Sequence, residues 1–275
     1  MQFADIFDQP AKLPSIPKVV QELIETFNQD NIDMDMLATK ISMDPVLTAK
    51  VLRLANSVHY GVSRTIASMS EASIVLGFST LRTLVLASGI TGAFQTPNGF
   101  DQKAFWRESF AIAAISRWLA PYSHLNPEVA FTTGMLHDIG DLILISVLPE
   151  ESKKIAAAVK AGGKRIDIEN AMLGYNYADI GAELARRWKF PQDIIDGIQY
   201  HAKPLSQDPT PKLAGLIYLA MYIHQGHKQK LGDEEILAEF PVNVASSINL
   251  DIHNAKEDIM QLDGIESGMD ALLNN

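Results

Sequence analysis

The sequence predicts an all-α protein made of two packed helical sub-bundles. Apolar residues recur at helical spacing along most of the chain, as in Leu47, Val51, Ala55 and Val58. Sustained alternation of apolar and polar residues, the signal of a half-buried strand, is weak throughout. Hydrophobic residues make up 47% of the 275 residues, which is enough to fill a sizeable core. Together these observations favour packed helices over a sheet.

The first predicted helices lie before residue 60. An amphipathic stretch covers residues 16–27, after the breaker Pro14, and a second covers residues 36–42. A third helix begins at Pro45, because Asp44 is a good N-cap and proline at the first helical position lacks an N–H that would be unpaired anyway.

A turn in the middle of the chain predicts a boundary. Residues 70–76 form a helical pattern that stops at Gly77, and Ser79 then caps the run 81–90. The cluster Thr96-Pro97-Asn98-Gly99 consists of turn residues. We therefore expect an N-terminal sub-bundle over residues 1–97 and a second sub-bundle over residues 98–248.

The second sub-bundle begins with an apolar helix over residues 106–119, and Asn126-Pro127 opens the next helix. Gly162-Gly163 predicts a turn. Further helical patterns cover residues 180–188, 194–201 and 213–227. The acid-rich residues 249–275 are expected to form a C-terminal tail.

Composition excludes several classes of protein. The absence of cysteine excludes disulfides, zinc fingers and thiol catalysis, and it fits a reducing cytoplasm. The net charge of -10 disfavours nucleic acid as a partner. The chain has no run of about 18 uninterrupted apolar residues and no signal-peptide pattern after Met1. We therefore expect a cytoplasmic protein that binds neither nucleic acid nor a membrane.

The adjacent pair His137-Asp138 is the most informative local feature. An imidazole beside a carboxylate on an apolar stretch gives a helix two ligands for a divalent metal, as metal-dependent phosphate ester hydrolysis requires. A working site needs several more ligands from other helices.

Several blocks of the sequence resemble the HDOD family, the HD-related output domains. The resemblance runs from about Leu13 to about His227, and the blocks occur in the family's order. The blocks are Leu13-Pro14-Ser15-Ile16-Pro17, residues 44–57, residues 70–77, Trp106-Arg107-Glu108-Ser109, Leu136-His137-Asp138-Ile139-Gly140, Ile180-Gly181-Ala182 and Trp188-Lys189-Phe190-Pro191. HDOD domains are similar to HD-type metal phosphohydrolases, including cyclic-di-GMP phosphodiesterases. The resemblance implies an HD-like helical fold in the C-terminal half and a regulatory or interaction role in bacterial signalling.

The same resemblance implies where the metal ligands of an active relative would lie. His137 and Asp138 match the central pair, and one of two expected later histidines is kept as His201. Glu108 stands where the first histidine is expected, and a carboxylate can still bind a metal.

Other positions of the implied metal shell carry unsuitable residues. Tyr177 and Tyr200 replace histidines, and a neutral phenol is a poor ligand. Met221 replaces a late aspartate, and a thioether does not suit a hard cation. Asp141 stands where active cyclic-di-GMP enzymes carry a lysine, and no Gly-Tyr-Pro triplet occurs. We therefore expect no cofactor. The alternative is one weakly bound divalent metal on His137, Asp138 and Glu108.

Each candidate also has a structural interpretation. His137 and Asp141 are four residues apart on one helical face and could hydrogen-bond to each other. In this interpretation His137-Asp138 has no metal and serves to hold helices together. His201 lies at a helix end, where a protonated imidazole favours the helix dipole. His224 and His227 are expected at a solvated helix end.

The leading prediction is a non-catalytic bacterial signal-transduction module that acts by binding a partner protein or a small ligand. The alternative is a divergent metal-dependent phosphohydrolase or phosphodiesterase that uses Glu108, His137, Asp138 and His201. A third hypothesis is a small-molecule sensor that keeps the degenerate pocket without the metal.

Overall fold

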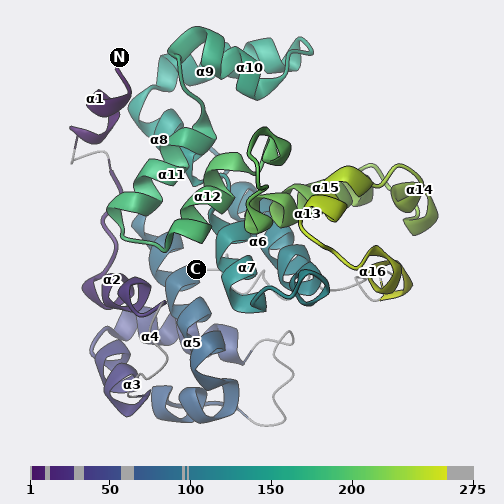
Figure 1. Cartoon of the computed structure of the whole chain (residues 1–275). Helices are drawn as coiled ribbons and strands as arrows, with labels where there is room; N and C mark the ends of the chain where they lie inside the picture. Colours follow the sequence, from purple (N-terminus) through teal and green to yellow (C-terminus); the bar gives the residue numbers. More distant parts are fainter. Residues whose placement is uncertain are drawn as a thin grey trace.

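The computed structural model describes residues 2–9, 13–27, 34–56, 65–94, 97 and 99–258, and within them every regular element is a helix. The all-α prediction is confirmed (Figure 1). The first part of the chain contains α1 (Phe3–Phe7), α2 (Lys18–Glu25), α3 (Met34–Ser42), α4 (Pro45–Ala55) and α5 (Met69–Ala93). The second part contains α6 (Gln102–Leu119), α7 (Pro127–Leu136), α8 (Ile139–Val147), α9 (Pro149–Lys160), α10 (Arg165–Leu173), α11 (Tyr177–Arg187), α12 (Gln192–Tyr200), α13 (Lys212–Lys228), α14 (Asp233–Ala238), α15 (Val242–Ser247) and α16 (Ile252–Asp258).

The two predicted proline helix starts are confirmed. The Asp44 carboxylate accepts hydrogen bonds from the backbone N–H groups of Val46 and Leu47, both at 3.0 Å. The Asn126 side chain does the same for the first turn of α7. Both caps satisfy N–H groups that the helix itself leaves unpaired.

Helix α5 is one element with a break inside it. Gly77 has φ 73° and ψ 169°, a backbone conformation that favours glycine, so the predicted stop at this residue is confirmed and the helix then resumes. Every residue from Leu81 to Ile90 is buried.

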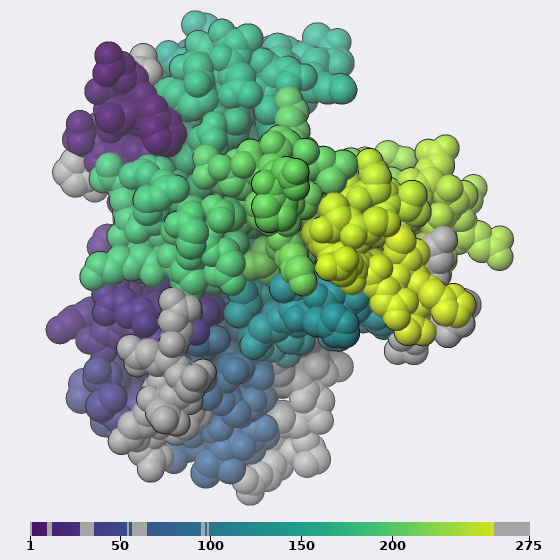
Figure 2. Space-filling view, in the orientation of Figure 1, coloured from purple at the N-terminus to yellow at the C-terminus, as the bar shows by residue number. Residues whose placement is uncertain are grey.

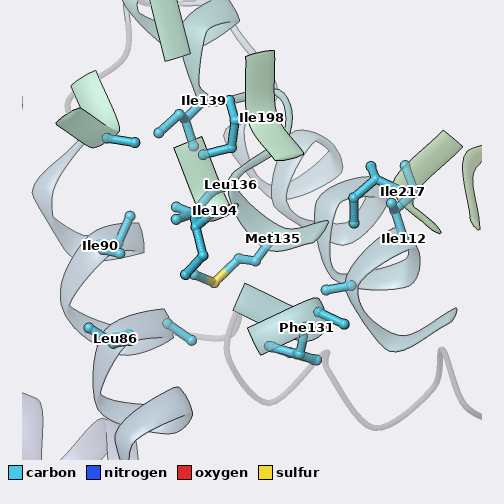
Figure 3. Packing of buried hydrophobic residues seen from close by; sticks show 14 of the residues in the cluster. Leu86, Ile90, Ile112, Phe131, Met135, Leu136, Ile139, Ile194, Ile198 and Ile217 are labelled. Carbon is cyan, nitrogen blue, oxygen red and sulfur yellow. The ribbon is translucent and has the colours of Figure 1, made fainter. Parts of the chain in front are cut away.

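Helix α5 connects the two parts of the chain. It packs against α2, α3 and α4 and also against α7. Figure 3 shows Leu86 and Ile90 of α5 in one cluster of buried side chains with Phe131 and Met135 of α7 and Ile194 of α12. The division at residue 97 stays a prediction, and Thr96 and Asn98 of the predicted turn lie outside the described residues.

The N-terminal segments also contact the second part of the chain. The ring of Phe3 meets the ring of Tyr175 edge-on at 5.2 Å, and the Arg187 guanidinium lies 4.5 Å from the centre of the Phe7 ring. Figure 2 shows α1, in purple, against the teal and green part of the chain. At the end of α2, Glu25 forms an ion pair with Lys189 at 2.7 Å.

Helices α8, α9 and α10 were not identified individually from the sequence. The run that forms α8 is apolar except for Asp141 and Ser146, so it lacks a clear helical stripe, and Pro149 then opens α9. The turn predicted at Gly162-Gly163 separates α9 from α10. Of the predicted tail, residues 249–258 are described and include α16, whereas residues 259–275 lie outside the described part.

Two stretches of the described chain are long and apolar enough to cross a membrane, namely Met69–Ala93 and Pro127–Val147. Burial inside the protein covers 56% and 72% of their most apolar windows. Core helices pass the same test of length and composition, and the packing of α5 and α7 against other helices accounts for the apolar character of both stretches.

Candidate functional site

His137 and Asp138 lie at the junction of two helices, where His137 ends α7 and Asp138 precedes α8. The His137 ring is buried and its Nδ1 lies 2.6 Å from the carbonyl oxygen of Gly134. Because a carbonyl oxygen only accepts hydrogen bonds, Nδ1 carries the proton and donates. The neutral ring therefore keeps its lone pair on Nε2. The bond also satisfies a carbonyl at the end of α7.

His201 repeats this arrangement at the end of α12. Its Nδ1 donates to the carbonyl oxygen of Ile198 at 2.6 Å, and its Nε2 lies 2.9 Å from the Tyr177 hydroxyl. Nε2 therefore accepts a hydrogen bond from the Tyr177 hydroxyl. The rings of His137 and His201 meet edge-on with centres 5.3 Å apart. The structure thus brings together two of the predicted ligands, with a phenol bonded to the second.

The two glycines of the family blocks allow α8 and α11 to cross closely. A Cβ added to Gly140 would lie 1.9 Å from the carbonyl oxygen of Tyr177 and 2.6 Å from the backbone nitrogen of Gly181. Both distances are far below van der Waals contact. Gly140 is therefore required by packing, and this crossing brings the start of α8 against Tyr177.

Arg165, which was not identified from the sequence, provides the cation of the site. Its three guanidinium nitrogens face three carboxylates: Nη2 lies 2.5 Å from Asp141, Nε 2.8 Å from Glu169 and Nη1 3.4 Å from Asp138. The guanidinium also lies 4.1 Å from the centre of the Tyr177 ring. We call Asp138, Asp141, Arg165 and Glu169 the carboxylate–arginine cluster.

Glu169 fixes this cluster to α11. Its side chain is fully buried, and its second oxygen accepts a hydrogen bond from the backbone N–H of Tyr177 at 2.8 Å. The N–H belongs to the first turn of α11, where a carboxylate is favoured by the helix dipole. Arg165 and Glu169 are four residues apart, so α10 presents both on one face.

Burial sets the charge state of the two histidines. It lowers the pKa of His137 to about 4, and the nearby Arg165 charge lowers it further, against the opposing effect of the Gly134 hydrogen bond. Burial likewise lowers the pKa of His201 to about 3, with added effects from His137 and Arg165. Both rings are neutral near neutral pH, so the expected role of His201 as a protonated helix-end cation is not supported.

The cluster contains more negative than positive charge. Burial raises the pKa of Asp138 to about 6, with Arg165 opposing the change and Glu169 adding to it. Burial also raises the pKa of Asp141 to about 6, and the neighbouring Asp138 contributes. For Arg165, burial disfavours the charged form, but the three carboxylates outweigh it and raise the pKa. The guanidinium is therefore permanently charged.

Glu108 lies in a different interaction from the one predicted. Its carboxylate meets His224 Nε2 at 3.0 Å and Lys228 at 2.8 Å, both on α13. Burial raises the pKa of Glu108, but hydrogen bonds from Lys228 and His224 outweigh it, and the net shift is downward. The hydrogen bonds of Glu108 do not reach His137 or Asp138, although its partner His224 helps to lower the pKa of His137. His224 is buried, so its expected place at a solvated helix end was wrong.

The remaining predicted substitutions have different environments. Tyr177 is buried in the site, and Asp141 pairs with Arg165 rather than with His137. Met221 is partly buried and packs against the hydrophobic core. Tyr200 is half-buried at the last position of α12.

The residues present do not fit a divalent metal. Among the described residues, no group of three or more His, Asp or Glu side chains is arranged to hold one. The His201 lone pair is bonded to Tyr177, and the Arg165 guanidinium pairs with the carboxylates. A permanent cation there repels a second one.

The low pKa of His201 has a measurable consequence. Because the unfolded chain takes up a proton near pH 6.5 and the folded chain only near pH 3, this group lowers the free energy of unfolding as the pH falls between them, by up to about 1.4 kcal/mol per pH unit. His201→Gln keeps an acceptor for Tyr177 but does not titrate. We expect the stability difference between wild type and variant to shrink as the pH is lowered from about 7 to about 4.

Urea unfolding at several pH values measures this difference. A difference independent of pH would contradict the neutral buried state of His201. Asp138 and Asp141 act in the opposite direction, because their raised pKa values make the folded chain bind protons first as the pH falls to about 4. Their contribution is present in both proteins and cancels in the comparison.

The fold and the site together define an HD-like helical domain with a histidine pair and a carboxylate–arginine cluster around the junction of α7 and α8. The HDOD domain family model matches residues 13–204. The chain therefore belongs to the HDOD family of signal-transduction domains.

Solved structures share the fold of this chain, and a curated relative resembles part of its sequence. A protein described as a "putative phosphohydrolase" from Shewanella amazonensis SB2B is 35% identical, with a TM-score of 0.86 and 98% of each chain covered. An HDOD domain protein of unknown function from Geobacter sulfurreducens shares the fold, with a TM-score of 0.78, 22% identity and 98% of each chain covered. The cyclic di-GMP phosphodiesterase CdgJ of Vibrio cholerae is 24% identical over 204 residues, which are 64% of this chain and 46% of CdgJ. The chain spans less than half the length of the curated relatives it matches.

Proposed function

We propose that this protein is a non-catalytic signalling module that acts by binding a protein partner in the bacterial cytoplasm. One observation carries the proposal: the side chains of Tyr177 and Arg165 occupy the site in which a metal-dependent relative would use its His-Asp pair. Hydrolysis of a phosphodiester in an HD-type site depends on metal-bound hydroxide, and a site closed by these two side chains has no means of generating it.

The charge of the site also supports this proposal. A phosphodiester is anionic and must be held by positive charge as its ester bond breaks. Here the single guanidinium is surrounded by Asp138, Asp141 and Glu169, so the cluster carries a formal excess of two negative charges when all are ionised. The cluster itself therefore disfavours an anionic group, whereas Lys153 and Lys160 line the cleft beside it.

Metal analysis combined with a turnover assay tests the non-catalytic part. We expect protein purified without chelator to carry less than stoichiometric divalent metal, and to leave a generic phosphodiester intact in manganese buffer. His137→Ala is expected to behave identically in both measurements. Stoichiometric metal in the wild type, with turnover that His137→Ala abolishes, would establish the phosphohydrolase alternative instead.

Affinity purification with the full chain, followed by reconstitution with the purified candidate, tests the partner. We expect one protein to bind the wild type and to stay bound when Arg186→Met removes an exposed surface ion pair with Glu183. If no recovered protein binds this chain once both are purified, the proposed partner-binding role is wrong.

A second candidate, the binding of a small ligand, is favoured by a cleft. An open cleft of about 600 Å³ lies between α8, α9 and the segment around Phe100, and Asp141 and Arg165 form part of its wall. Leu144, Ile155 and Val159 supply apolar lining. This volume falls in the range of small-molecule sites. A ligand there would contact the carboxylate–arginine cluster directly.

A further inference from the structure

Two neighbouring helices, α8 and α9, line most of the open cleft of about 600 Å³. They pack against each other, and Figure 1 shows them at the same end of the molecule. From α8 come Asp141, Leu144 and Ile145, whose i, i+3, i+4 spacing places them on one helical face. The residues that α9 contributes repeat at the same spacing, and they include Ser152, Lys153, Ala156, Val159 and Lys160. The cleft is therefore built from one face of each helix.

The apolar part of the cleft wall is open to water. Val159 is 37% exposed, and the side chains of Ile145 and Phe100 are partly exposed. A ligand that covers these side chains removes apolar surface from water, which favours binding. A ligand that fits this cleft therefore has an apolar or aromatic body.

The charged part of the wall is more positive than negative, with Lys153, Lys160 and Arg165 against Asp141. Arg165 is already held by carboxylates, so the two lysines are the available cations. Lys153 pairs with Glu150 at 2.8 Å, but the two side chains are 73% and 71% exposed, and a pair this exposed is weak. Lys160 forms no ion pair within the described part of the chain. The wall therefore complements an anionic group.

The positions of these charges orient a bound molecule. Lys153 and Lys160 are seven residues apart, which is two turns of α9, so both lie on the side of α9 that faces the cleft. The carboxylate of Asp141 is on α8, and it disfavours an anionic group beside it. The acidic group of a ligand is therefore expected at α9, with its apolar body over Ile145 and Phe100.

We infer that this cleft is a binding site for a small amphipathic anion, a molecule with an acidic group on an apolar or aromatic body. The inference deepens the small-ligand candidate of the proposed function and rests on it. The cleft volume fits a small molecule, and the net charge of -10 opposes adhesion of the chain to an anionic membrane. The ligand is therefore taken up from solution.

Isothermal titration calorimetry of the full chain with decanoate tests the inference. We expect one decanoate to bind per chain. Acetate has the charge without the apolar chain, and decyltrimethylammonium has the chain with the opposite charge, so each should bind about tenfold more weakly or less. Because the whole protein is strongly acidic, its overall charge favours the cation, and a preference for decanoate can come only from a local site.

A tryptophan placed in the cleft locates the site. Ala156→Trp is expected to abolish decanoate binding, because the indole fills the space between α8 and α9. Ala157→Trp is the matched control, since Ala157 is the next residue of α9 and lies outside the cleft wall. Both alanines are exposed, so both variants are expected to fold, which circular dichroism checks.

A pair of lysine variants identifies the cations. Lys153→Gln combined with Lys160→Gln is expected to weaken decanoate binding about fivefold. Lys18→Gln combined with Lys154→Gln removes the same charge from exposed lysines outside the cleft and should leave the affinity unchanged.

Three results would overturn the inference: no decanoate binding, equal binding of decanoate and decyltrimethylammonium, or decanoate binding that survives Ala156→Trp. A purified protein partner that binds the wild type without decanoate binding, and that Ala156→Trp releases, would assign the cleft to a macromolecule instead. Stoichiometric metal with turnover that depends on His137 would overturn the non-catalytic function and leave decanoate binding intact, so the two failures are distinguishable.

Discussion

Replacing Gly140 with alanine is expected to lower the free energy of unfolding by about 3 kcal/mol, because the new methyl group meets backbone rather than movable side chains. The carbonyl oxygen of Tyr177 would lie 1.9 Å from the added Cβ, so α8 and α11 must separate. That movement also shifts Tyr177 relative to Arg165 and His201. Urea unfolding, monitored by circular dichroism, measures the loss.

Gly92→Ala is the matched control for this substitution. Gly92 lies in α5, and its added Cβ would meet only the end of the flexible Lys50 side chain at 3.4 Å. Since alanine is the better helix former by about 1 kcal/mol, we expect no loss and a small gain. Equal losses at the two glycines would contradict the close crossing of α8 and α11.

Trp106→Ala is expected to cost about 3–5 kcal/mol and to destabilise both parts of the chain together. The indole is 2% exposed, and its ring lies within 5.9 Å of the ring of Phe94 and 5.2 Å of that of Phe105. Phe94 in turn contacts Trp188 at 6.3 Å. Phe94 directly follows α5, and α5 packs against α2, α3 and α4 as well as against α7. Loss of the Trp106 contact with Phe94 therefore destabilises helices in both parts of the chain.

Two probes distinguish joint from separate unfolding. All three tryptophans lie after residue 97, whereas circular dichroism reports every helix. Coincident transitions by fluorescence and circular dichroism are expected in the wild type and in the variant. Two separated transitions would show that the N-terminal helices unfold independently. Trp106→Phe is the control and should cost clearly less, because phenylalanine keeps an aromatic ring in contact with Phe94 and Phe105.

Local signals in the sequence predicted most of the helices. Asp44-Pro45 and Asn126-Pro127 specify helix starts through their own side chains and backbone, so their effect does not depend on distant residues. The apolar run of α8 could not be assigned in the same way. Its only polar residues are Asp141 and Ser146, and this polar face is too narrow for a clear helical periodicity.

The candidate site was predicted only in part, for a related reason. The resemblance identified His137 and His201, and the structure brings their rings together. It gave no indication of Arg165, because the partners Asp138 and Asp141 are more than 20 residues away in sequence and meet it only through folding. The i, i+4 spacing of Arg165 and Glu169 was the one available signal, and it is common on solvated helices.

The break at Gly77 divides α5 into two segments of very different local stability. Before it, the side chains of Ile74 and Val75 are 81% and 41% exposed, whereas Leu81 to Ile90 are buried without exception. Opening the first segment exposes less buried apolar surface, mainly that of Met69 and Ala72, whereas opening the second requires the core to come apart. Amide protons before Gly77 should therefore exchange with solvent through local fraying, while those after Leu81 exchange only when the whole protein unfolds.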